Sequence, residues 1–234
     1  MKKFGVLLAA MFATVAAQAA TVNWGAAIDT GLIDTSGAAL AQGNYVRVGY
    51  FGTLSNALVS SNALTLSGIG TLNADFHQFD SSTIGAGTFA AGSFSASSQP
   101  SYSTLPGFNP ANQQIYIWAL KSTDTSSLAN ALATATQTAI GYVPFANNAQ
   151  WQFPANDLAQ SKVIDLSGLS SSSRQILAGT YVAGTSASLT SIFGSPNSAL
   201  QLAPVAITGV PEPSTLAVGF LTILTAAGVR RRRK

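Results

Sequence analysis

The sequence has no cysteine, and it has only one histidine, His77, and one glutamate, Glu212. The lack of cysteine excludes thiol catalysis, thiolate metal sites and disulfide bonds, so burial of a core has to hold any fold together. The 21 glycines form no dinucleotide-binding fingerprint or phosphate loop, and no Gly-x-Ser-x-Gly elbow is present. These absences predict that the chain is not an enzyme and holds no cofactor or metal.

Charged residues are also scarce, at 8% of the 234 residues, and most of the cations lie at the two ends. The formal net charge is +3, from eleven Lys and Arg against eight acids. Two of the cations lie at positions 2 and 3 and five at 230–234. The region between the two ends therefore has four cations and seven aspartates, a net charge of about −3. A mildly acidic domain offers no basic face to DNA or RNA, so nucleic acid is not an expected partner.

The first 19 residues have the pattern of a secretory signal peptide. A short basic start precedes an apolar run over residues 4–16, and Ala17 and Ala19 flank Gln18 as a small-x-small cleavage site. The alternative is an N-terminal membrane anchor, which needs a longer apolar run than this one. We therefore predict cleavage after Ala19, with signal peptidase as a partner.

The last 25 residues combine three parts in a fixed order. A Pro-Glu-Pro motif is followed by a 16-residue apolar segment, 214–229, and then by a basic cluster. As a transmembrane helix this segment is about 24 Å long, a short span of a hydrocarbon core of roughly 30 Å. Five consecutive cations would stop it from crossing further and disfavour the alternative, a C-terminal core helix. The motif region is Val210, Pro211, Glu212, Pro213 and Ser214, and the membrane stop is Arg230, Arg231, Arg232, Arg233 and Lys234.

Together, Pro211-Glu212-Pro213, the apolar segment and the arginine cluster resemble the PEP-CTERM sorting signal of exported bacterial proteins. The resemblance covers residues 210–234, roughly a tenth of the chain. It implies that an exosortase, a membrane enzyme, cuts near the motif and passes the product towards the cell surface or extracellular matrix. It also implies a transient stay at the inner membrane. From the positive-inside rule we expect the basic end in the cytoplasm and the domain outside.

Residues 20–209, between the two signals, have the length of one folded domain. Short apolar stretches separated by turn residues predict an antiparallel β-sandwich, jelly-roll-like, with a barrel as the alternative. In the strand predicted at 44–51 alternate residues face opposite sides, so we expect Arg47 to pair with an aspartate or to mark the solvent face. The strand at 113–120 is apolar on both faces, which is typical of a central strand. Shorter strands are expected at 21–24, 87–94, 140–143, 151–154, 162–166, 179–184 and 200–208, with a loop at 95–112.

One short inserted helix is expected in this domain. Ile69, Leu72, Phe76 and Phe79 recur at helical spacing, so residues 68–79 are predicted to form an amphipathic helix laid over the sheet. Residues 126–139 are ambiguous, because Ala and Leu favour a helix whereas the threonines favour an irregular strand.

Few side chains qualify as catalytic or binding candidates. A Ser-His-Asp triad would need His77 with Asp75 or Asp80, but on the predicted helix His77 lies off the apolar stripe and faces water. A glycosidase pair would need two of seven scattered aspartates, and none stands out. Asp29 and Asp34 bracket a stretch that lacks the alternating oxygen ligands of a calcium loop, so a turn capped by aspartate is the preferred interpretation.

Trp24, Trp118 and Trp151 could stack on sugars, but their apolar neighbours favour a place in the core. Segments 45–49, 114–118 and 151–154 also resemble, diffusely, a group of PEP-CTERM proteins of unassigned function. We expect a non-enzymatic exported protein of the cell surface or extracellular matrix. One alternative is a carbohydrate-binding or polysaccharide-modifying protein with exopolysaccharide as its partner; a weaker one is an enzyme that depends on His77 or an aspartate pair.

Overall fold

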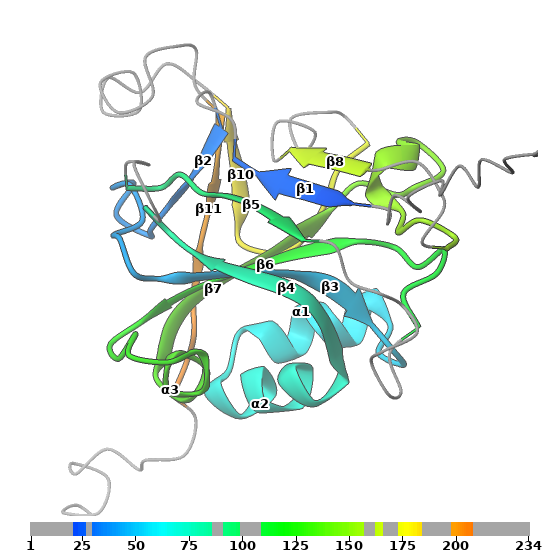
Figure 1. The fold of residues 1–234 in the computed structure, drawn as a ribbon. Helices are drawn as coiled ribbons and strands as arrows, with labels where there is room; N and C mark the ends of the chain where they lie inside the picture. The colour runs from blue at the N-terminus through cyan, green and yellow to red at the C-terminus, as the bar shows by residue number, and fades with distance from the viewer. Residues whose placement is uncertain are drawn as a thin grey trace, which may run out of the picture.

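The computed structural model describes residues 21–26, 30–85, 91–98, 109–156, 162–165, 173–183 and 198–207. Its centre is a six-stranded antiparallel sheet in the order β12-β7-β6-β3-β4, with β9 paired to β7 (Figure 1). These strands are β3 (Tyr45–Phe51), β4 (Phe76–Thr83), β6 (Tyr116–Ser122), β7 (Ala135–Tyr142), β9 (Gln175–Ala178) and β12 (Ala203–Pro204). The predicted mainly β class is confirmed.

Two three-stranded sheets, β5-β1-β8 and β10-β11-β2, accompany the central sheet. Their strands are β1 (Val22–Gly25), β2 (Thr30–Ile33), β5 (Ser95–Ser98), β8 (Lys162–Asp165), β10 (Thr180–Ala183) and β11 (Ser198–Gln201). Strand pairing is mostly antiparallel, as predicted, and the pairs β1–β8 and β2–β11 are parallel exceptions. The loop predicted at 95–112 is corrected, because it begins with β5.

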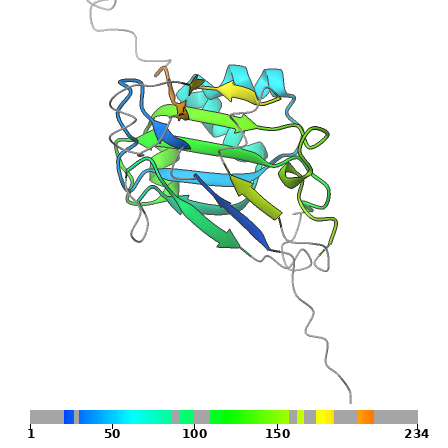
Figure 2. The same cartoon turned by 90° about the horizontal axis from the view of Figure 1, so that it is seen from above.

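Three α-helices lie on one face of the central sheet, and β1 and β8 lie on the other (Figure 2). The helices are α1 (Asn56–Ala63), α2 (Leu66–Asp75) and α3 (Leu128–Ala133), and η1 (Ala149–Trp151) is a 3-10 turn. Ser55, Thr65 and Ser127 cap the three α-helices, each accepting a hydrogen bond from the backbone N–H three residues on. The expectation of a single inserted helix is therefore wrong.

The helix predicted over 68–79 is right as far as Asp75 and wrong beyond it. Phe76 already has an extended backbone and opens β4, which pairs with the whole length of β3. Phe76 therefore packs on the helix side of the sheet and Phe79 in the opposite core, although helical spacing had placed them on one stripe. Pairing with a long neighbouring strand outweighed a weak local periodicity.

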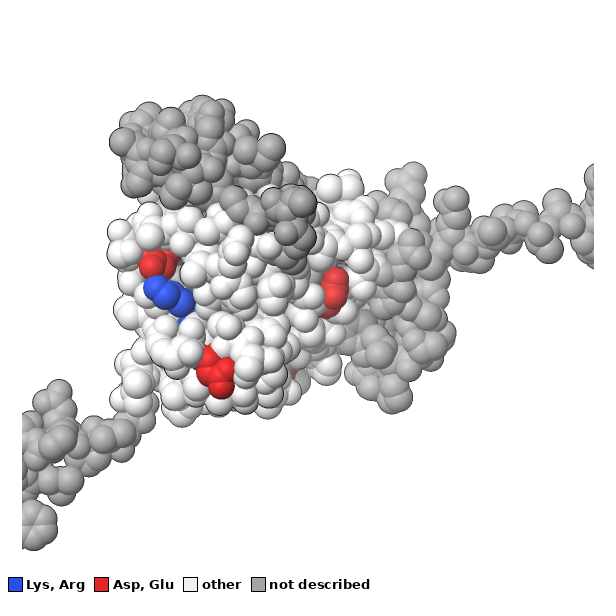
Figure 3. All heavy atoms as spheres, turned by 60° about the vertical axis from the view of Figure 1, so that its left-hand side comes forward, with Lys and Arg blue, Asp and Glu red and all other residues white. Residues whose placement is uncertain are grey.

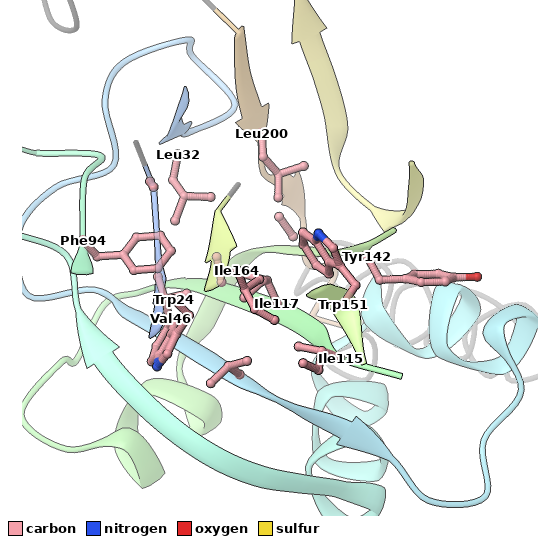
Figure 4. Close-up of a cluster of buried hydrophobic side chains, with 14 of the residues drawn as sticks. Trp24, Leu32, Val46, Phe94, Ile115, Ile117, Tyr142, Trp151, Ile164 and Leu200 are labelled. Atoms are coloured by element: carbon pink, nitrogen blue, oxygen red, sulfur yellow. The ribbon is translucent and has the colours of Figure 1, made fainter. Parts of the chain in front are cut away.

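The central sheet buries side chains on both faces. The first core contains Val46 and Val48 of β3 and Ile117 of β6, together with residues of β1, β8 and β11 (Figure 4). The second core, beneath the helices, contains Phe51 of β3 and Trp118 of β6. Both strands alternate as predicted, and β6 is confirmed as a two-sided central strand. The ambiguous stretch 126–139 contains both elements, since α3 leads into β7.

Candidate functional site

The predicted cleavage and sorting residues, Ala17, Ala19, 210–214 and 230–234, lie outside the described residues, as does the predicted transmembrane helix. The structure does describe the chain as far as Ile207, three positions before the predicted motif region. We call residues 203–207 the exit segment. Figure 1 shows its orange trace running down from β11 to the side occupied by the helices.

The exit segment is bonded to the fold almost to its last residue. β12 extends the edge of the central sheet by pairing with β7, and the Val205 N–H donates to the Thr136 carbonyl at 2.8 Å. The Ala206 N–H donates to the Leu64 carbonyl at 2.8 Å, and the Leu66 N–H donates to the Ala206 carbonyl at 3.0 Å. The chain is therefore fixed to the α1–α2 junction up to Ala206.

This attachment sets how far the motif can lie from the domain. Five Cα-to-Cα steps separate Ala206 from Pro211, so even a fully extended chain keeps the motif within about 18 Å of the fold. Eight steps separate Ala206 from Ser214, the first residue of the predicted membrane segment, which limits that distance to about 28 Å. An enzyme that cuts at the motif would have to work close to the helix side of the domain.

The described surface around the exit segment carries three large, exposed apolar side chains. Leu58 is 50% exposed, Leu64 44% and Ile207 70%. At 100° per residue, Ala57, Leu58 and Ser61 lie on one exposed face of α1, and the exposed C-cap residue Leu64 continues this face. On the face seen in Figure 3, the few charged side chains of the described residues lie apart from one another or as one adjacent pair of opposite sign.

A polar contact fixes α1 to the sheet. The Asn56 side chain donates to the Tyr142 hydroxyl at 2.6 Å, and the Tyr116 hydroxyl donates to the Asn56 carbonyl oxygen at 3.0 Å. The two tyrosine rings also pack with centroids 4.7 Å apart. Burial, helped by the nearby Tyr142, raises the pKa of Tyr116 to about 12, so both hydroxyls stay protonated at neutral pH.

His77 lies in β4, not on a helix, so its predicted placement is wrong. Its ring stacks on Tyr50 with centroids 4.8 Å apart. The Asp75 carboxylate accepts from the backbone N–H groups of Thr53 and Leu54, and Asp80 accepts from the indole N–H of Trp24 at 3.0 Å. Within the described chain neither carboxylate hydrogen-bonds to His77, so the triad considered above is not assembled there.

Asp34 forms the turn expected of it, whereas Asp29 lies outside the described residues. The Oδ1 of Asp34 accepts hydrogen bonds from the Ser36 N–H at 2.8 Å and from the Ala38 N–H at 3.2 Å. Its Oδ2 accepts from the Lys121 ammonium at 2.7 Å. Burial alone would raise the pKa of Asp34, but the hydrogen bonds from Lys121 and Ser36 outweigh it and lower the pKa to about 2.

We expect this carboxylate to make the fold acid-sensitive. Because the pKa of Asp34 is depressed on folding, its stabilisation is complete above pH 3.8 and is lost as the pH falls towards about 2. The loss is roughly 2 kcal/mol of unfolding free energy. Urea unfolding from pH 5 to pH 2 would measure it, with Asp34→Asn as the matched variant that keeps the turn acceptor. Parallel pH profiles for the two proteins would contradict the assignment.

The three tryptophans are core residues, as preferred from the sequence. Trp24 is 2% exposed, Trp118 0% and Trp151 1%. In this structure they cannot form a sugar-stacking platform.

Arg47 contradicts both sequence expectations. It is 3% exposed, so it does not mark the solvent face, and its Nε donates to the Gln78 side-chain carbonyl at 2.6 Å, not to an aspartate. Its guanidinium carbon lies 4.7 Å from the ring centroids of both Phe76 and Trp118, a double cation–π contact. Burial lowers the pKa of Arg47 to about 10. The sequence carries no signal for this contact, which depends on strand register.

In the described part of the chain, no helix has the length and apolar character needed to span a membrane, and no three His, Cys, Asp or Glu side chains gather as metal ligands. Searches of family models, curated proteins and solved structures found no match to this chain.

Proposed function

We propose that this chain is a non-enzymatic exported protein of the cell surface or extracellular matrix, sorted by an exosortase through residues 210–234. The observation that carries the proposal is the ordered conjunction of Pro211-Glu212-Pro213, an apolar segment and five terminal cations. On this proposal signal peptidase removes residues 1–19, and the apolar segment holds the domain at the inner membrane until the exosortase acts.

The exit segment is compatible with such processing. Among the described residues, the last hydrogen bonds that fix it are those of Ala206, and Pro211 lies five positions further on. Cleavage at or after the motif would leave the pairing of β12 with β7 and both bonds of Ala206 in place. The domain can therefore keep its fold after the tail has been removed.

For the fold we further propose an elaborated β-sandwich, jelly-roll-like in outline. Its support is the first core, which the central sheet shares with strands of both small sheets. Trp24 of β1 and Ile164 of β8 contribute to this core from the side opposite the helices. The two parallel pairs are departures from jelly-roll pairing.

The sorting proposal is tested with the double variant Glu212→Ala, Pro213→Ala. We expect loss of the exosortase cut, so that the full-length product accumulates at the inner membrane. The control Thr208→Ala, Thr215→Ala changes residues on either side of the motif and is expected to be processed normally. Fractionation and mass measurement of the products read out both effects. Identical processing and location of wild type and motif variant would refute the sorting role.

The carbohydrate-binding alternative has less support than before, because the three tryptophans that suggested it are buried. Phe145, 43% exposed, is the most accessible aromatic side chain among the described residues. Retention on an exopolysaccharide column that is lost in Phe145→Ala would favour this alternative, and equal, weak retention across a polysaccharide panel would count against it.

A further inference from the structure

We propose that the surface beside the exit segment rests on the lipid bilayer while the tail holds the protein at the membrane. We call this surface the exit face. It consists of Ala57, Leu58 and Ser61 of α1, Leu64 at the C-terminal end of that helix, and Ile207. The inference rests on the proposed membrane-held tail and adds an orientation to it, with one helix face as a second, reversible membrane contact.

The residues of the exit face belong together in space. Ala57, Leu58, Ser61 and Leu64 share the solvent side of α1. The hydrogen bond from the Ala206 N–H to the Leu64 carbonyl places Ile207 directly beside this helix end. α1 also buries Val59 and Ala63, so it carries apolar residues on both its buried and its exposed side. A surface helix typically carries polar or charged residues opposite its buried stripe, so the exposed Leu58 of α1 departs from that pattern.

The exit face also lacks charge. No Asp, Glu, Lys or Arg occurs from Thr53 to Ala74, which covers both α1 and its neighbour α2. The carboxylate that follows, Asp75, is held by the backbone and hydroxyl of Thr53 and by the Leu54 N–H. An uncharged face with exposed leucines avoids repulsion from anionic headgroups and can insert its apolar side chains at the acyl boundary.

Chain length identifies the bilayer as the occupant. Ala206 lies within about 28 Å of the first residue of the predicted membrane segment, less than the usual width of a domain of this size. The domain therefore has to lie close to the bilayer with its exit side towards it. Such tethering raises the effective concentration of lipid at the exit face, so that a weak interfacial affinity is sufficient.

The absence of cysteine allows a direct test with single thiol labels in the full-length protein. Leu58→Cys and Leu64→Cys report on the exit face. Val163→Cys is the matched control, because Val163 is 59% exposed and lies on β8, across the central sheet from the helices (Figure 2). Ile223→Cys reports on tail insertion. Each variant carries an environment-sensitive fluorophore and is reconstituted into phosphatidylethanolamine–phosphatidylglycerol vesicles that contain an acyl-chain nitroxide quencher.

We expect the labels at 58 and 64 to be quenched about threefold more strongly than the label at 163, because interfacial apolar groups lie about 5–10 Å into the headgroup and acyl boundary. Quenching at 58 and 64 should persist when ten Gly-Ser residues are inserted between Gly209 and Val210. If the quenching at 58 and 64 then falls to the level at 163, the short linker alone had kept these labels near the bilayer, and the proposal is wrong.

The other outcomes are equally decisive. Strong quenching at 223 with equal, weak quenching at 58, 64 and 163 would overturn the docking face and leave the membrane-held tail intact. No quenching at 223 would overturn the tail and, with it, this inference. Pyrene labels at 58 that form excimers without lipid quenching would assign the face to a second copy of the chain instead.

Discussion

Replacing Trp118 by alanine is expected to lower the free energy of unfolding by about 3–5 kcal/mol, a large share of the stability of one domain. The side chain is fully buried in the second core, and its indole N–H donates to the Thr138 hydroxyl at 3.0 Å. Its ring also packs against Phe76 with centroids 5.3 Å apart and forms one of the two aromatic contacts of the Arg47 guanidinium. Truncation therefore leaves a cavity and a buried cation that has lost one aromatic partner.

Urea unfolding followed by circular dichroism would measure this loss from the shift in the transition midpoint. The control is Phe145→Ala, which removes an aromatic side chain that is 43% exposed and should change the unfolding free energy by no more than about 0.5 kcal/mol. A Trp118→Ala protein as stable as Phe145→Ala would mean that the second core is not packed as described.

Two glycines of α2 are expected to respond to alanine with opposite signs. A Cβ at Gly68 would lie 2.7 Å from the Cα of Asn62 and closer still to its carbonyl oxygen, and this backbone cannot turn aside as a side chain can. We expect Gly68→Ala to cost about 3 kcal/mol through overpacking of the α1–α2 contact. At Gly70 a Cβ would meet no atom within 4 Å, so Gly70→Ala should stabilise the helix by about 0.5–1 kcal/mol.

Thermal and urea unfolding of the two variants side by side would check the contrast. Because both changes have the same effect on helix propensity, their difference isolates the close approach of α1 to α2. Equal effects at the two positions would show that the helices lie further apart than this structure places them.

The predictable features of the fold are those that depend on the residues of a single strand. β3 and β6 alternate as expected because side chains in a strand point to opposite faces wherever the strand lies. β8, β10 and β11 with β12 were expected as short strands, although their partners were not. Parallel pairing of β1 with β8 joins segments far apart in the chain, and alternation within one strand carries no information about the neighbour.

The helix α1 and the end of α2 were missed for a different reason. Only Val59 and Ala63 of α1 are buried, so its apolar pattern does not point inward and gives no helical signal. At Phe76 the helical period continues, yet pairing with β3 draws the chain into a strand. His77 was misplaced for the same reason, and with it the orientation of its ring.

The candidate site likewise has one part that the sequence predicts and one part that only the structure reveals. The predicted sorting motif can be proposed from the sequence because it is a short contiguous pattern. The exit face is not visible there, since it joins α1 to Ile207 across more than half the chain through a hydrogen bond between Ala206 and Leu64. The local pattern of Leu58 and Leu64 alone does not distinguish a buried helix from one that faces a membrane.

If the chain is exported as proposed, the parallel pairing of β2 with β11 sets an order of events during transport. Its register places Thr30 beside Ser198, and the Gln201 side chain donates to the Asp34 carbonyl at 3.2 Å. A chain that crosses the membrane from its N-terminus cannot complete this sheet until residue 201 has emerged, ten positions before Pro211. Long-range strand pairs of this kind form slowly. On the proposed export route, the domain would therefore close only when the predicted sorting signal is about to follow, so transport would be almost over before folding could finish.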